Sequence, residues 1–183
     1  MVRHIGLGSA AAIAATALLA SPAGAQLSSE GGPIRVNADS SQILERDRRV
    51  LVIGNVDIIQ GDARLRADTV TLFYGSNGAG GAGIGGSFGE IERMRAEGDV
   101  FYVTPDLKAR GDVGTYDAQS DTITLTGQEV VLIRCEDVAR GTELVINVAA
   151  GQTTLKGGDR SDGRVSILLF PEGSEEAGAQ PDC

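Results

Sequence analysis

The chain has 183 residues, a formal net charge of −9, two cysteines and one histidine, His4. If the first 25 residues are removed, as argued below, the mature chain has no histidine, which excludes a Ser-His-Asp or Cys-His catalytic group and histidine-ligated zinc. Two cysteines also exclude a four-cysteine metal site. The excess of acidic residues argues against nucleic acid as a partner. We therefore expect a binding or carrier protein that is not an enzyme and has no cofactor and no metal site.

Residues 1–25 have the pattern of an export signal. Arg3 and His4 supply a positive start, residues 5–20 form an apolar run, and residues 21–25 end in small residues typical of a cleavage site. The run is shorter than the ~20 residues of a membrane-spanning helix. We expect cleavage before Gln26, with an uncleaved N-terminal anchor as the alternative. Cleavage removes one arginine and no acid, which leaves 15 basic residues against 25 acidic ones.

A repeated pattern of markers runs through the rest of the chain. Short glycine-containing steps, such as 54–56 and 98–100, alternate with steps in which a small residue precedes Asp, and the unit is about 29 residues long. Between the markers, apolar and polar residues alternate with the period of two that is typical of β-strands. The parity of the apolar positions switches at Asp68, which predicts a β-bulge or corner within each leg.

The predicted fold is therefore all-β. An antiparallel meander of kinked legs gives two facing sheets with apolar side chains between them, and it leaves unpaired edges at the first and last legs. The interior is either an ordinary packed core or a slot for an apolar ligand. The candidate positions for lining this interior are Val36, Val50, Val52, Val56, Ile58, Leu65, Val70, Leu72, Val100, Tyr102, Ile123, Leu125, Val130, Leu132, Leu144 and Ile146.

Two segments lie outside this pattern. Residues 75–90 hold 8 of the 26 glycines and predict a flexible insertion, for which we have no functional account. Residues 172–183 predict a disordered acidic tail. Export would permit a disulfide between Cys135 and Cys183, but free thiols or a pairing between chains are equally consistent with the sequence.

The marker steps resemble the OstA/LptA family of lipopolysaccharide-transport periplasmic proteins. The resemblance begins with residues 33–39 and 52–68, where GNVDIIQG is followed by LRAD, and continues at 96–100 and 125–127. It covers about residues 33–171 and gives the expected domain division, which is a cleaved signal at 1–25, an OstA-like β-jellyroll at 26–171 and the acidic tail.

The resemblance implies an open, V-shaped antiparallel β-jellyroll of about 16 short strands with no catalytic activity. It implies that lipopolysaccharide acyl chains lie in the apolar groove, so that the sixteen interior positions become candidates for acyl-chain contact. It also implies end-to-end self-association and stacking with inner-membrane anchored and outer-membrane jellyroll components of a transport bridge. Because the chain has neither a retained membrane helix nor a long barrel, it resembles the soluble bridging member, which is periplasmic.

Other interpretations remain for the fold and for some polar residues. A structural or adhesive β-solenoid that self-assembles without a lipid ligand is the alternative function. The marker residues Asp39, Asp68 and Asp112 are spaced too widely for a calcium loop and predict local hydrogen bonds at corners. Some arginines could bind lipid phosphates, but a solvated face balanced by acids is the favoured interpretation. These are Arg64, Arg66, Arg93, Arg95 and Arg110.

Overall fold

The computed structural model describes residue 27 and residues 32–75, 91–158 and 163–170. The predicted export signal, nearly all of the glycine-rich insertion and the acidic tail lie outside the described residues. The expectations for those segments, including cleavage before Gln26, therefore stay predictions.

The described chain consists almost entirely of β-strands, as the alternating pattern predicts. The strands are β1 (Arg35–Asn37), β2 (Ser40–Leu44), β3 (Arg49–Gln60), β4 (Ala63–Tyr74), β5 (Ile91–Val103), β6 (Lys108–Asp117), β7 (Thr122–Arg134), β8 (Asp137–Asn147), β9 (Gln152–Lys156) and β10 (Ser166–Leu168). One turn of 3-10 helix, η1 (Glu45–Asp47), joins β2 to β3. Within the described ranges no helix is long and apolar enough to cross a membrane.

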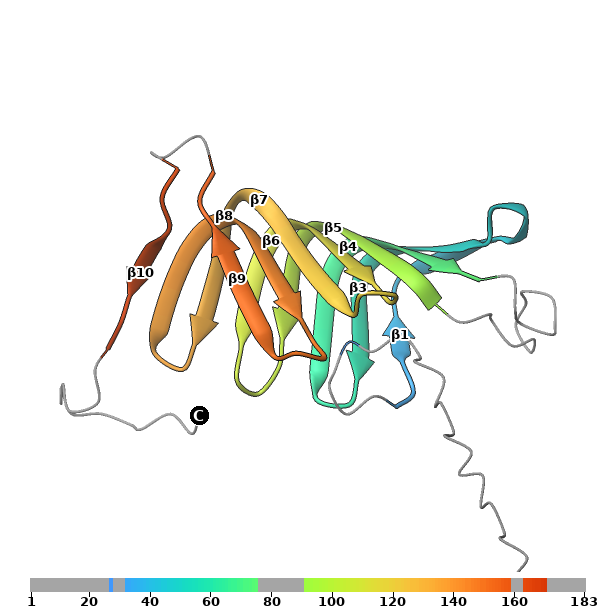
Figure 1. Ribbon diagram of the computed structural model, residues 1–183. Helices are drawn as coiled ribbons and strands as arrows, with labels where there is room; N and C mark the ends of the chain where they lie inside the picture. The colour runs from blue at the N-terminus through green and yellow to red at the C-terminus, as the bar shows by residue number, and fades with distance from the viewer. Residues whose placement is uncertain (1–26, 28–31, 76–90, 159–162, 171–183) are drawn as a thin grey trace, which may run out of the picture.

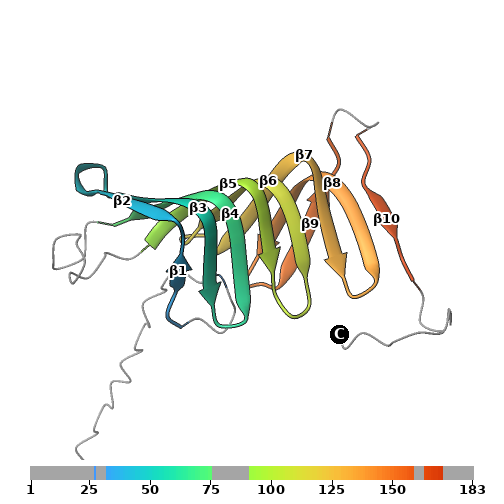
Figure 2. The same ribbon diagram turned by 180° about the vertical axis from the view of Figure 1, so that it is seen from behind.

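All the strands belong to one antiparallel sheet. The order along the sheet is β1-β3-β4-β5-β6-β7-β8-β10, and β2 and β9 pair with the other halves of β3 and β8. Figures 1 and 2 show these strands as a row of bent legs, with β1 near one end and β10 at the other. Because each strand from β2 to β8 pairs with the next along the chain, most of the row is built from successive hairpins.

Each long leg bends near its middle. The register shifts between Ile53 and Val56 where β3 pairs with β4, and comparable shifts occur in every pairing from β4–β5 to β7–β8. Such a shift is a β-bulge, which turns the strand and re-aims its side chains. The expected all-β open jellyroll is confirmed. The described residues form ten strands in one sheet, compared with the expected number of about 16, because each of the six long legs β3 to β8 runs through its corner as one continuous strand.

The corners are built from a glycine and an aspartate of the preceding leg. Gly54 has a φ of +80°, and Asn55 follows it with a φ of +46°. The backbone N–H of Asp39 donates to the carbonyl of Gly54 at 2.9 Å, and Asp39 Oδ2 accepts from Asn55 Nδ2 at 2.8 Å. A Cβ on Gly54 would overlap the Asp39 carboxylate. Only glycine combines the left-handed conformation with this close approach.

The same arrangement recurs along the sheet. Gly98, with a φ of +81°, lies against the carboxylate of Asp68, and Asp112 Oδ2 accepts from the backbone N–H of Gln128 at 2.8 Å. The prediction of local hydrogen bonds at the corners is therefore confirmed for Asp39 and Asp112.

We expect Gly98→Ala to lower the free energy of unfolding by about 2 kcal/mol or more, because the new methyl group meets Asp68 and φ becomes unfavourable. Gly151→Ala is the matched control. Gly151 also has a positive φ, +62°, but a Cβ there has open space, so we expect a loss of only about 1 kcal/mol. Urea unfolding followed by circular dichroism measures both, and equal losses would contradict the role assigned to the Asp68 contact.

Candidate functional site

The sixteen interior positions predicted from the sequence lie between the two halves of the bent sheet. Twelve of them are buried in one core cluster, and three are partly buried and packed against it. The three are Val50, Leu72 and Leu132. Val36 on β1 is the exception, with 38% of its surface exposed. Their burial agrees with the predicted interior set. Contact of these residues with a ligand stays a prediction.

A large apolar cavity opens at the N-terminal end of this interior. It has a volume of about 540 Å³ and includes four of the predicted positions, Val36, Val50, Val52 and Leu72. Strand alternation places these side chains on the inner face, because β-strand side chains point alternately to opposite faces. The unfilled part of the interior is therefore formed mainly by β1, β3 and β4.

The rest of the cavity wall consists of residues outside the sixteen predicted positions. Ile34, Tyr74 and Ile91 add apolar surface, and Asp39, Ser40 and Ser41 add polar atoms where β1 passes into β2. Tyr74 and Ile91 flank the glycine-rich insertion, so the repeat pattern ended before it reached them. Ile34 precedes the first marker. The cavity thus combines apolar walls with polar groups along one side.

The middle of the interior is nearly filled. A second cavity there has a volume of about 20 Å³, which is room for about one water molecule. Its walls include predicted positions such as Leu65 and Leu125, and also Met94 and Tyr116, which the sequence analysis did not name. Both alternate with polar neighbours along their strands, so the period of two was a signal that could have found them.

Leu27 is the least expected member of this core. It lies outside every strand, yet only 2% of its surface is exposed, and it lines the small central cavity. Its backbone N–H donates to Gln60 Oε1 at 2.5 Å, and its carbonyl accepts from the Tyr102 hydroxyl at 2.8 Å. Burial, with smaller contributions from Asp62 and Asp121, raises the pKa of Tyr102 to about 12. The phenol therefore stays protonated and able to donate.

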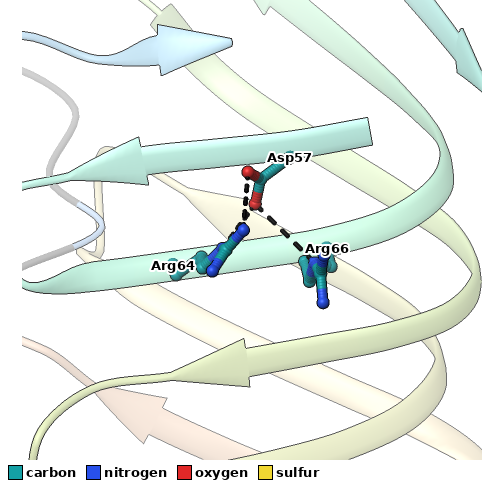
Figure 3. Close-up of polar contacts among 3 residues, drawn as sticks. All are labelled: Asp57, Arg64 and Arg66. Atoms are coloured by element: carbon teal, nitrogen blue, oxygen red, sulfur yellow. Dashed lines mark hydrogen bonds and ion pairs between the residues drawn. The ribbon is translucent and has the colours of Figure 1, made fainter. Parts of the chain in front are cut away.

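Four of the five arginines considered as phosphate ligands lie in ion pairs on the surface of the sheet. Figure 3 shows Arg64 and Arg66 on β4 directed toward Asp57 on β3. Arg64 Nε and Nη2 donate to the two Asp57 carboxylate oxygens at 2.6 and 2.9 Å, and Arg66 Nε lies 3.8 Å from Asp57 Oδ1. The hydrogen bond from Arg64 is the main cause that holds the pKa of Asp57 below its usual value, against a smaller opposing effect of burial.

The other arginines of this set also have neighbours of their own. Arg95 pairs with Glu97 at 3.0 Å and Arg110 pairs with Asp99 at 2.7 Å, while the Arg93 guanidinium lies 5.1 Å from the centre of the Phe73 ring. These contacts support the interpretation as a solvated face balanced by acids.

We expect Arg64→Met to raise the pKa of Asp57 toward its ordinary value, because the hydrogen bond that favours the carboxylate is lost. A lowered folded-state pKa stabilises the fold above the unfolded-state pKa, and this contribution disappears as the pH falls through the folded-state value. The stability difference between the two proteins should therefore be present at pH 7 and should shrink as the pH falls below the ordinary aspartate pKa of about 4. A carboxyl-detected NMR titration of Asp57 measures the shift, and an unchanged pKa would contradict this assignment.

The C-terminal end of the sheet carries exposed apolar side chains. β10 pairs with the Val138–Arg140 part of β8, and Ile167, Leu168, Leu169 and Phe170 are all exposed. The Phe170 backbone N–H donates to Asp137 Oδ1 at 3.0 Å, which holds the end of this segment against β8. Cys135, at the β7–β8 turn, is disulfide-bonded. Cys183 lies outside the described residues.

The bent sheet and its apolar slot define an open β-jellyroll. A crystal structure of the same shape is that of LptH, described as the LptA-homologous periplasmic component of the lipopolysaccharide transport device of Pseudomonas aeruginosa. The TM-score is 0.62 with 22% identity, and the match covers 76% of this chain and 96% of that one. At this identity the likeness shows the fold.

The family is shown by sequence. The family model described as LptA/(LptD N-terminal domain) LPS transport protein matches residues 35–152. An uncharacterized protein of Rhizobium meliloti (strain 1021) is 32% identical over 149 residues, which cover 81% of this chain and 76% of the relative. The chain belongs to the LptA/LptD N-terminal domain family of lipopolysaccharide-transport proteins, and the resemblance inferred from its repeats is confirmed.

Proposed function

We propose that this protein is a periplasmic carrier that holds the acyl chains of lipopolysaccharide in its apolar slot. The observation that carries the proposal is the 540 Å³ cavity between the two halves of the bent sheet, in a chain of this transport family. Its volume lies within the range of about 300–1,000 Å³ typical of ligand sites. Removing an acyl chain from water gains about 0.8 kcal/mol per CH2 group, so the slot needs no reactive group.

The position of the cavity supports entry from one end of the sheet. Val36 at the N-terminal edge is exposed, and the cavity extends inward past Val50 and Val52. The polar atoms of Ser40 and Ser41 lie beside it, where they suit the sugar and phosphate parts of the lipid. The other predicted contact positions lie in the filled core, so they would contact an acyl chain only if the interior opens.

We extend the proposal to assembly at the two ends of the sheet. β1 and β2 form one edge, and β9 and β10 form the other, so unpaired main-chain groups are available at both. The exposed apolar run from Ile167 to Phe170 suits burial against the edge of a second jellyroll. Such contacts would join copies of this chain and connect them to inner-membrane anchored and outer-membrane jellyroll components, which makes one continuous slot. The periplasmic component LptH supports this location.

We expect a photo-crosslinking amino acid at Leu72 to capture lipopolysaccharide in cells, because that side chain lines the cavity. The matched control is Thr71, the adjacent residue of β4, whose side chain points to the opposite face of the sheet. Adducts are identified by lipid-specific immunoblotting. Protein adducts alone at Leu72 would contradict the carrier function and favour the adhesive β-solenoid.

We expect Ile167→Asp together with Leu169→Asp to weaken end-to-end association at least tenfold, since charge would be placed in an apolar contact. Phe101→Asp is the control, because Phe101 is an exposed apolar side chain on β5 in the middle of the sheet. Sedimentation velocity over a concentration series measures the association of each purified protein. Unchanged association of the double variant would rule out this end of the sheet as the contact.

A further inference from the structure

The interior of the slot already contains one residue from the N-terminal part of the chain, Leu27. Leu27 is buried between the two halves of the sheet, and it lines the central cavity together with Leu65, Met94 and Leu125. An acyl chain that continues from the N-terminal cavity into the middle of the interior would need this volume. The cavity left beside Leu27, about 20 Å³, is too small for a chain of CH2 groups.

The polar contacts around Leu27 recognise its backbone. Gln60 is the one buried polar side chain among the described residues, and 2% of its surface is exposed. Its amide oxygen accepts from the Leu27 N–H, and its Nε2 donates to the carbonyl of Gly32 at 3.0 Å. Gln60 therefore holds both Leu27 and the residue where the described chain resumes. The Tyr102 hydroxyl holds the Leu27 carbonyl from β5.

These residues lie near the ends of the legs, away from the corners. Gln60 is the last residue of β3 and Tyr102 is next to the last residue of β5, so both are at the ends of legs remote from the corners. Tyr116 and Leu125 approach the same central cavity from the facing half of the sheet. Leu27 thus lies between the two halves of the sheet, beside the small central cavity and outside the walls of the unfilled N-terminal cavity.

We propose that Leu27 is a displaceable plug that closes the middle of the slot until an acyl chain takes its place. The inference rests on the proposed carrier function and adds a regulation of the same site. Leucine suits the role because its side chain offers the same aliphatic surface as a lipid chain. A single residue held by two backbone hydrogen bonds presents a much smaller barrier to opening than a strand of the sheet would. With cleavage before Gln26, Leu27 would be the second residue of the mature chain, and because it belongs to none of the described strands, its release breaks no strand pairing.

A plug of this kind makes a quantitative prediction. The apparent affinity for ligand is reduced by the fraction of molecules in which the site is closed, so removing the plug raises it. We expect Leu27→Ala to bind fluorescently labelled lipopolysaccharide about threefold or more tightly than the wild type. A mature chain that begins at Gly32, and so lacks the plug altogether, should show an equal or larger gain. Fluorescence anisotropy titration of the folded, purified proteins measures both.

Two controls separate a plug from an ordinary core residue. Leu27→Met keeps the aliphatic volume and should bind as the wild type does. Leu107→Ala truncates a leucine of the same core cluster that comes from the β5–β6 turn. It should lower the melting temperature without a gain in affinity. An equal gain for Leu107→Ala would show general loosening of the core and would overturn the proposal.

Amide hydrogen exchange gives a second readout that a purely structural Leu27 would not change. In the wild type, saturation with lipopolysaccharide should remove the protection of the Leu27 amide, because its bond to Gln60 is broken. Retained protection, or unchanged or weaker binding by Leu27→Ala, would overturn the plug while binding by the wild type leaves the carrier function intact. If no form of the protein binds lipopolysaccharide, the carrier function fails and the plug fails with it.

Discussion

The close contact between a left-handed glycine and the aspartate of the preceding leg is the constraint on which the rest of this structure depends. At Gly54 and Gly98 the chain turns within a strand, and a side chain at either position would collide with Asp39 or Asp68. These turns lie where β3 and β5 shift register against their neighbours, and register shifts occur in every pairing from β3–β4 to β7–β8, so a single hydrogen-bonded sheet bends and faces itself. Without these bends the apolar face of a flat sheet would stay open to water.

The corner also decides which side chains enter the slot. On β4, Leu65 and Ala67 precede the corner at odd positions, whereas Val70 and Leu72 follow it at even ones, and all four belong to or pack against the same core. In a regular strand without this irregularity, residues at odd and even positions point to opposite faces. One of the two pairs, Leu65 and Ala67 or Val70 and Leu72, would then face solvent. The local strain at the corner is therefore offset by apolar burial on both halves of each leg.

The slot is empty at its N-terminal end and filled in its middle, and this difference bears on the proposed transport function. At the N-terminal end the inner face is open over a volume suited to a ligand, while in the middle Leu27 and its neighbours leave almost no space. A carrier must both bind an acyl chain and pass it on, so continuous tight binding would be a disadvantage. In the proposed mechanism, Leu27 closes this part of the interior and keeps it protected from water when no lipid is present.

By itself the sequence determined the class of fold and the inner face of the sheet. The period of two identifies strands, the repeated glycine and aspartate steps identify corners, and both signals are local, so residues such as Val52 and Leu125 could be assigned to the interior. Only the tertiary structure decided which part of that interior is empty and which is filled. Leu27 has no periodic pattern, and its place depends on Gln60 and Tyr102, which are 33 and 75 residues away. Contacts between such distant parts of the chain arise from packing in three dimensions, for which the alternation along one strand contains no information.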